Sequence, residues 1–198
     1  MKGNLNREKS CSLCYNRLMD CSCFPESERK KMRHLAHLSV QDKVEYGAVI
    51  EPGCALGPTI QGKAHEISIE KTPTSIGSSH THPYAEAIPS AADIEDMLVK
   101  QDKLMCIIQA AHRNPDINCY NPQSPEKFQA MGLVARWLKD DVKSYVQDLV
   151  ARHGPEMKAE TTEEKLRGME LRKRALGVRL TIEKTQDSLL RRCSLKGD

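Results

Sequence analysis

Ser78-Ser79-His80-Thr81-His82-Pro83 is the stretch around which the chain is organised, and Ser90-Ala91-Ala92-Asp93 follows it closely. Side chains of an extended segment alternate between its two faces, so His80 and His82 are predicted to project from the same face. Asp93, at the start of the next helix, would add a carboxylate. Two imidazoles and one carboxylate suit Zn²⁺ and leave a fourth position open, as a catalytic zinc requires. The motif therefore indicates the centre of a metal-dependent hydrolase.

The spacing of these residues resembles the motif of the JAMM (MPN+) zinc metalloproteases, which is His-Ser/Thr-His-Pro followed by Ser-x-x-Asp. The resemblance covers residues 40–122 and implies a mixed sheet flanked by helices. It also implies that His80, His82 and Asp93 bind a catalytic zinc. By the same resemblance, Ser90 would help to stabilise the tetrahedral intermediate.

An upstream glutamate is a further catalytic residue that the resemblance implies. It maps best onto Glu45, in the apolar segment Val44–Ile50, and Glu51 and Glu66 are the alternatives. Such a glutamate would accept a proton from the attacking water and pass it to the leaving amine. The implied reaction is hydrolysis of a peptide or isopeptide bond in a protein or peptide, including conjugates of a ubiquitin-like modifier. The alternative is a non-catalytic zinc-binding adaptor or interaction protein with the same fold.

The second motif also has a purely structural interpretation. Ser90 and Asp93 have the spacing of a capping box, with the serine at the N-cap and the carboxylate at the third helical position. The two roles are compatible, because a capping box would hold Asp93 where a metal ion could meet it. For the histidines, the structural alternative is an exposed or hydrogen-bonded pair without a metal.

Charge is distributed unevenly over the 198 residues. Lys and Arg outnumber Asp and Glu by eight to four in residues 1–37 and by eleven to eight in residues 156–198, whereas residues 38–155 carry eleven against fifteen. Basic ends suit an acidic partner, but a solvated surface explains them better than nucleic-acid binding does. No apolar run reaches the length of a membrane span, and the polar start is not typical of a signal peptide. We expect a cytoplasmic protein.

Four of the eight cysteines lie close together near the N-terminus: Cys11, Cys14, Cys21 and Cys23. In a reducing compartment such a cluster is more typical of a metal site than of disulfides. Four thiolates would complete a closed tetrahedral zinc site, so the sequence predicts a structural zinc besides the catalytic one. A redox-active or unligated cluster is the alternative. Cys106, in an apolar stretch, is predicted to be a small core residue.

Turn residues and apolar periodicity divide the middle of the chain into short elements. Strands are predicted at 44–50, 74–80 and 104–111, with weaker candidates at 58–61, 65–70 and 116–120. Helices are predicted at 25–38, at 91–100 and from Ser124, with Pro125 at the first helical position, to Gly154. Helices beside a mixed sheet indicate an α+β (α/β layered) fold.

The last part of the chain is rich in Glu, Lys, Arg and Leu and predicts one long helix over 161–192. One heptad frame holds five apolar residues in eight positions: Leu166, Met169, Leu176, Leu180 and Leu190. A coiled coil that forms a homo-oligomer and a helix that folds back on the domain are the two interpretations. The predicted organisation is a Cys-rich zinc knuckle with a short helix (1–38), a JAMM-like catalytic domain (39–155) and a helical tail (156–198).

Overall fold

The computed structural model describes residues 23–111, 113–154 and 161–195. Within them the chain forms four helices and a mixed sheet of seven strands, which confirms the predicted α+β class. The helices are α2 (Glu26–Asp42), α3 (Ala91–Lys100), α4 (Pro125–His153) and α5 (Thr162–Leu189). The strands are β1 (Tyr46–Glu51), β2 (Ala55–Leu56), β3 (Ile60–Gln61), β4 (Gly77–His82), β5 (Leu104–Gln109), β6 (Ile117–Pro122) and β7 (Leu190–Leu195).

The sheet has the strand order β2-β1-β4-β5-β6-β7, and β3 also pairs with β1. Among the described strands, β4 and β5 are the only parallel neighbours, and the other pairs are antiparallel. β4 is paired along both edges, with β1 on one side and β5 on the other. The strand that carries the two histidines is therefore held in register from both sides.

Contacts within the chain define two units, which are interleaved in sequence. One unit holds α2 and all seven strands, and the other holds α3, α4 and α5. The predicted boundaries after residues 38 and 155 do not coincide with these units. The boundary after residue 38 is crossed because α2 packs on the sheet, and the boundary after residue 155 is crossed because the last strand, β7, pairs with β6.

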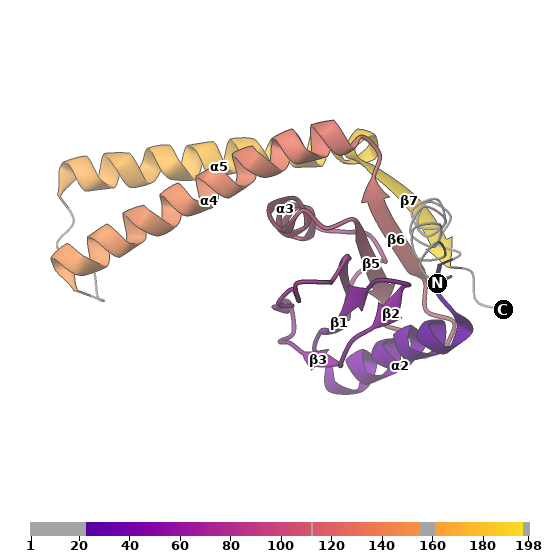
Figure 1. Ribbon diagram of the computed structural model, residues 1–198. Helices are drawn as coiled ribbons and strands as arrows, with labels where there is room; N and C mark the ends of the chain where they lie inside the picture. Colours follow the sequence, from indigo (N-terminus) through magenta and orange to yellow (C-terminus); the bar gives the residue numbers. More distant parts are fainter. Residues whose placement is uncertain (1–22, 112, 155–160, 196–198) are drawn as a thin grey trace, which may run out of the picture. The chain divides into compact units, whose positions relative to one another are not determined.

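In the first unit, α2 covers one face of the sheet (Figure 1). Its buried face includes Met32, Leu35 and Ala36, which pack in a core of strand residues. The strand residues of this core include Tyr46, Ala48, Ile50, Leu104, Cys106, Ile108, Ile117 and Cys119. These positions alternate along each strand, so the opposite face of the sheet carries the residues between them.

In the second unit, α4 and α5 run antiparallel and side by side, and α3 contacts both (Figure 1). α4 begins and ends where predicted, with Pro125 at its first position and Gly154, at φ 75°, as its C-cap. Its buried residues include Ala135, Leu138, Tyr145 and Leu149. Val134 and Trp137 are exposed, so the buried face of α4 does not extend to them.

The C-terminal helix ends before the predicted residue 192, and a strand follows it. α5 stops at Leu189, and residues 190–195 form β7, which pairs antiparallel with β6 over six positions from Pro122↔Leu190 to Ile117↔Leu195. Backbone hydrogen bonds to a distant strand override the local helix propensity of these residues, because propensity determines secondary structure only weakly. None of the helices in the described ranges has an apolar stretch long enough to cross a membrane.

Candidate metal centre

β4 brings the two histidines together as the sequence predicts. His80 and His82 lie on one face of the strand, and their Nε2 atoms are 3.2 Å apart. Two nitrogens bound to one tetrahedral zinc would be about 3.3 Å apart, given zinc–nitrogen bonds of about 2.0–2.1 Å. The pair therefore has the separation that a shared metal ion requires. The same separation would also allow a hydrogen bond between one protonated and one unprotonated ring nitrogen.

The first turn of α3 holds Asp93 in a capping box, as predicted. Asp93 Oδ2 accepts hydrogen bonds from the Ser90 backbone N–H and from Ser90 Oγ, both at 2.7 Å. In return, Ser90 Oγ accepts a hydrogen bond from the Asp93 N–H at 3.2 Å. The carboxylate is thus oriented by two donors, as ligating carboxylates are in metal sites.

The predicted ligands form one group. One ligand atom from each of His80, His82 and Asp93 lies within 4.8 Å of the other two. His80 is buried, and the other two are half-buried. Two imidazoles and a carboxylate fit Zn²⁺, which accepts nitrogen and oxygen ligands and keeps an open position in catalytic sites. In the described part of the chain, this is the group of side chains that could hold a metal ion.

Glu45 lies directly before β1, and its exposed fraction is only 9%. Gly47 is opposite His80 in the antiparallel ladder between β1 and β4. Opposite residues share a face of the sheet, and so do residues two apart in one strand, so Glu45 belongs to the face that carries the histidines. The backbone of Glu45 is fixed by hydrogen bonds with Gly62 and Lys63, each 2.8 Å long.

The two alternative glutamates are placed differently. Glu51 ends β1 four residues beyond Gly47, and its carboxylate accepts hydrogen bonds from the hydroxyls of Thr72 and Thr74. Glu66 is exposed and forms an ion pair with Lys63 at 3.5 Å. Of the three candidates, Glu45 alone is both buried and in register with the histidines.

Two residues of β6 that hold the segment after β4 in place were not among the residues predicted from the sequence. Asn118 Nδ2 and Tyr120 Oη both donate hydrogen bonds to the Ala87 carbonyl, at 2.8 and 2.9 Å, and so fix the segment that follows β4. Burial raises the pKa of Tyr120, which keeps its hydroxyl protonated as a donor. The alternating polar residues of the predicted strand 116–120 could have indicated these two hydrogen-bond donors.

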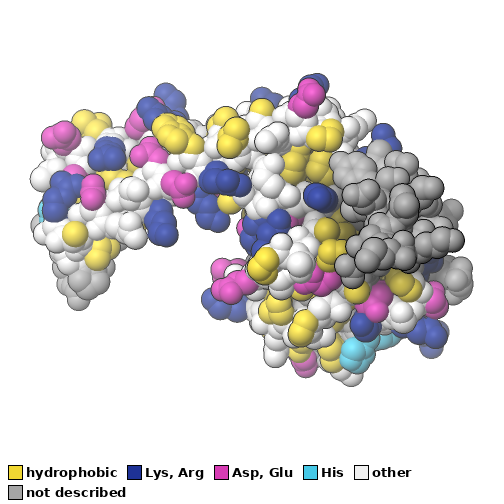
Figure 2. Space-filling model, viewed as in Figure 1, with side chains coloured by type: hydrophobic (Ala, Val, Ile, Leu, Met, Phe, Trp, Pro, Cys, Tyr) yellow, Lys and Arg dark blue, Asp and Glu magenta, His cyan; other side chains and the backbone are white. Residues whose placement is uncertain are grey.

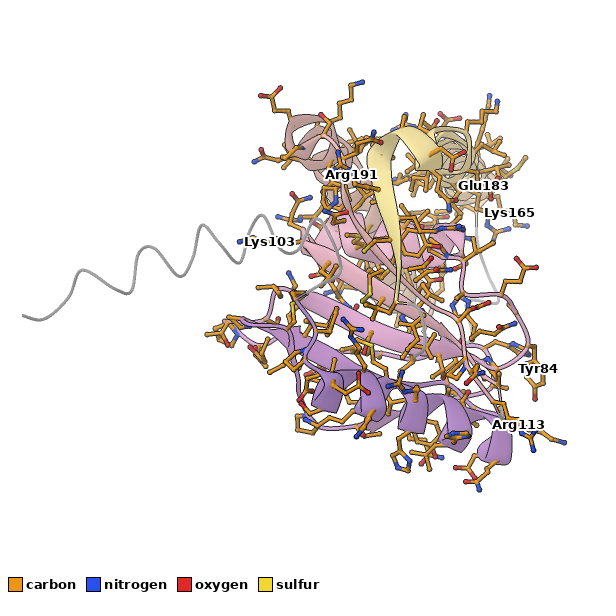
Figure 3. The ribbon with its side chains drawn as sticks, turned by 90° about the vertical axis from the view of Figure 1, so that its right-hand side faces the viewer. Tyr84, Lys103, Arg113, Lys165, Glu183 and Arg191 are labelled. Atoms are coloured by element: carbon orange, nitrogen blue, oxygen red, sulfur yellow. A yellow bond between two sulfur atoms is a disulfide. The ribbon has the colours of Figure 1, made fainter. Side chains whose placement is uncertain are left out.

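An exposed aromatic residue also stands near the histidines in the chain. Tyr84, two residues after His82, is 62% exposed and contacts the ring of His65, with 5.4 Å between the ring centroids. Its side chain points outward from the loop (Figure 3). A ring that is exposed in this way is available for contact with a ligand.

The cysteines differ from the prediction. Cys23 forms a disulfide with Cys54, so as bonded here it does not contribute a thiolate to the predicted structural zinc site. Cys11, Cys14 and Cys21 lie outside the described residues. Cys106 is buried in the core as predicted, but it is bonded to Cys119 on the neighbouring strand. Disulfides are typical of oxidising compartments, and the cytoplasmic location stays a prediction.

Comparison of the chain with models of known families, with curated proteins and with solved structures finds no significant match.

Proposed function

We propose that the chain is a zinc-dependent hydrolase of peptide or isopeptide bonds, similar to JAMM proteases. The single observation that carries this proposal is the convergence of His80, His82 and Asp93, whose ligand atoms lie within 4.8 Å of one another. The spacing of the motif, His-Thr-His-Pro followed by Ser-x-x-Asp, supports the same class of enzyme. A bound zinc ion would polarise a substrate carbonyl and make water a better nucleophile at neutral pH.

Glu45 is the proposed general base. It is buried on the histidine-bearing face of the sheet, which would keep a carboxylate close to an attacking water. There it would accept the proton of that water and deliver it to the nitrogen of the leaving amine. A buried position also limits exchange of this proton with bulk water.

Ser90 has a different role from the one that the resemblance implies. Its hydroxyl hydrogen is used in the bond to Asp93 Oδ2. We therefore propose that Ser90 orients the metal-binding carboxylate, and that it would contact a developing oxyanion only after its hydroxyl rotates. Loss of such an orienting partner typically reduces metal affinity or activity by about 10- to 100-fold.

Zinc analysis and a substrate panel test the proposal together. Purified chain is expected to bind zinc at this centre, and the double variant His80→Ala/His82→Ala is expected to lose that ion. Glu45→Gln should keep the zinc and lose hydrolysis of an isopeptide- and peptide-linked panel, because the base is removed while the ligands remain. Equal zinc content in wild type and the double variant would overturn the metal centre. Zinc binding without cleavage of any substrate would support the adaptor instead.

A further inference from the structure

α5 carries apolar side chains on two opposite sides. Its buried side includes Leu171, Ile182 and Leu189. The exposed side chains are Leu166, Met169, Leu176 and Leu180, between 44% and 65% exposed. At about 100° per residue, the two sets lie on nearly opposite sides of the helix. Hydrophobic side chains accordingly reach the surface of the α4–α5 pair between charged ones (Figure 2).

A groove of about 480 Å³ runs between α4 and α5 at one edge of this surface. The helices approach closely there: a Cβ on Gly168 would lie 2.8 Å from Tyr145 Oη. The groove is lined mainly by apolar residues and glycine: Val142, Tyr145, Val146, Leu149, Gly168, Met169, Leu171 and Ala175. Val146 and Met169 are exposed on opposite walls, so the groove is open to a partner.

The charged residues of this groove have one sign. Lys165 and Arg172, which lie about two turns apart on the same side of α5, are the charged residues that line it. Neither forms an ion pair within the described residues, and Lys165 stands out from its helix (Figure 3). By contrast, Arg167 is close to Asp141, and Arg174 pairs with Glu170 on the same helix.

The opposite wall, on α4, is apolar and is formed by Val142, Tyr145, Val146 and Leu149. Lys143 and Lys139 are exposed and lie one and two turns before Val146 on α4, outside the lining of the groove. Cations on the α5 wall and an apolar floor together define what fits: apolar side chains flanked by carboxylates.

We propose that this groove docks an acidic amphipathic helix of a partner protein. A third helix would cover the apolar floor and place Asp or Glu side chains beside Lys165 and Arg172. Nucleic acid fits less well, because phosphates cannot cover Val146 and Met169 and the groove's aromatic ring, Tyr145, is buried and unavailable for base stacking. A second copy of α5 would bring like charges together. The proposal does not depend on zinc binding or hydrolysis.

Selection from a peptide library tests the chemistry of the partner. The intact chain is used to select from displayed 18-residue helical peptides with apolar residues at i, i+3, i+4 and i+7 and with Glu, Lys, Ser or Ala at the flanking positions. We expect the selected peptides to be enriched in Glu over Lys. Absence of any enriched peptide, or enrichment of Lys, would overturn the proposal.

Variants then locate the binding surface. Met169→Glu and Arg172→Glu are each expected to weaken binding of the selected peptides by about tenfold or more, measured by fluorescence anisotropy, because like charges face the partner. Lys184→Glu is the matched control: it makes the same change of charge on α5, but away from the groove, and is expected to leave binding within about twofold. Met169 and Arg172 are exposed, and circular dichroism verifies that each variant is folded.

Two results would refute this surface. One is equal peptide affinity for wild type and Arg172→Glu. The other is binding of a labelled single-stranded oligonucleotide, or of vesicles containing phosphatidylserine, that is tighter than that of the peptides and is lost in Arg172→Glu.

Discussion

Replacing Asp93 by Asn separates the two roles of this side chain. In the structure its Oδ2 atom accepts two hydrogen bonds of 2.7 Å from Ser90, which complete the cap of α3. Loss of such a cap costs about 0.5–2 kcal/mol of unfolding free energy, whether or not zinc is present. As a metal ligand, Asp93 also supplies the only negative charge of the proposed set, so the substitution should weaken zinc binding as well.

The zinc-dependent part can be calculated separately. Zinc at 100 times its dissociation constant stabilises a protein that binds it only when folded by about 2.7 kcal/mol. If Asp93→Asn binds zinc 100-fold more weakly, the same concentration stabilises the variant by about 0.4 kcal/mol. We therefore expect the difference between unfolding free energies with zinc and with chelator to fall from about 2.7 to about 0.4 kcal/mol.

Urea unfolding followed by circular dichroism measures both quantities. Thr161→Ala is the control, because Thr161 and Glu164 form the equivalent capping box of α5, with bonds of 2.8 and 3.2 Å. This control should lose about 0.5–2 kcal/mol in both solutions and keep the whole zinc increment. If Asp93→Asn behaves like Thr161→Ala, Asp93 is a cap and not a ligand, and the proposed centre loses its carboxylate.

Three further predictions concern stability. Gly47→Ala should lower the unfolding free energy by about 1–3 kcal/mol in urea titrations, since the added Cβ would lie 2.5 Å from the Ser79 carbonyl oxygen; an unchanged value would show that β1 and β4 can separate without cost. Gly177→Ala, where no atom outside the adjoining helix backbone and the two chain neighbours lies within 4 Å of the added Cβ, should raise the unfolding free energy by about 0.8–1 kcal/mol through helix propensity, and a decrease would contradict this. The pKa of Glu164 is lowered to about 2, chiefly by the hydrogen bond from the Thr161 N–H. The stabilising effect of ionised Glu164 is complete above its ordinary pKa of 4.5 and is lost as pH falls towards 2. Glu164→Gln should therefore reduce the fall in unfolding free energy between these two pH values, and an equal fall in wild type and variant would refute the assignment.

Local motifs in the sequence predicted local structure well. The bounds of α3 and its capping box both follow from residues in or next to this one helix. The start of α4 at Pro125 and its end at Gly154 were predicted for the same reason. N-caps, proline at the first turn and glycine at the end act over a few residues, so their signals can be read without knowledge of the tertiary fold.

Features that depend on distant residues were predicted poorly. The first three residues of β7, 190–192, were assigned to a helix because its pairing partner, β6, lies about 75 residues earlier in the chain. Cys23 was assigned to a zinc site because its spacing to nearby cysteines is visible in the sequence, whereas its bond to Cys54 is not. The exposure of Trp137 on α4 also depends on distant residues, because the width of a buried helix face depends on which elements cover it.

The candidate centre shows why a metal site can be predicted better than the fold around it. Two of its proposed ligands are set by strand alternation, and the third is set by a helix cap, so short spacings determine all three. Glu45 is separated from them by more than thirty residues, and its assignment gained support only from the pairing of Gly47 with His80. The exposed side of α5 is the opposite case, because the heptad residues Leu166, Met169, Leu176 and Leu180 predict contact with another helix but not which side stays exposed. Only the packing of Leu171 and Ile182 on the other side of α5 decides that these four residues stay exposed.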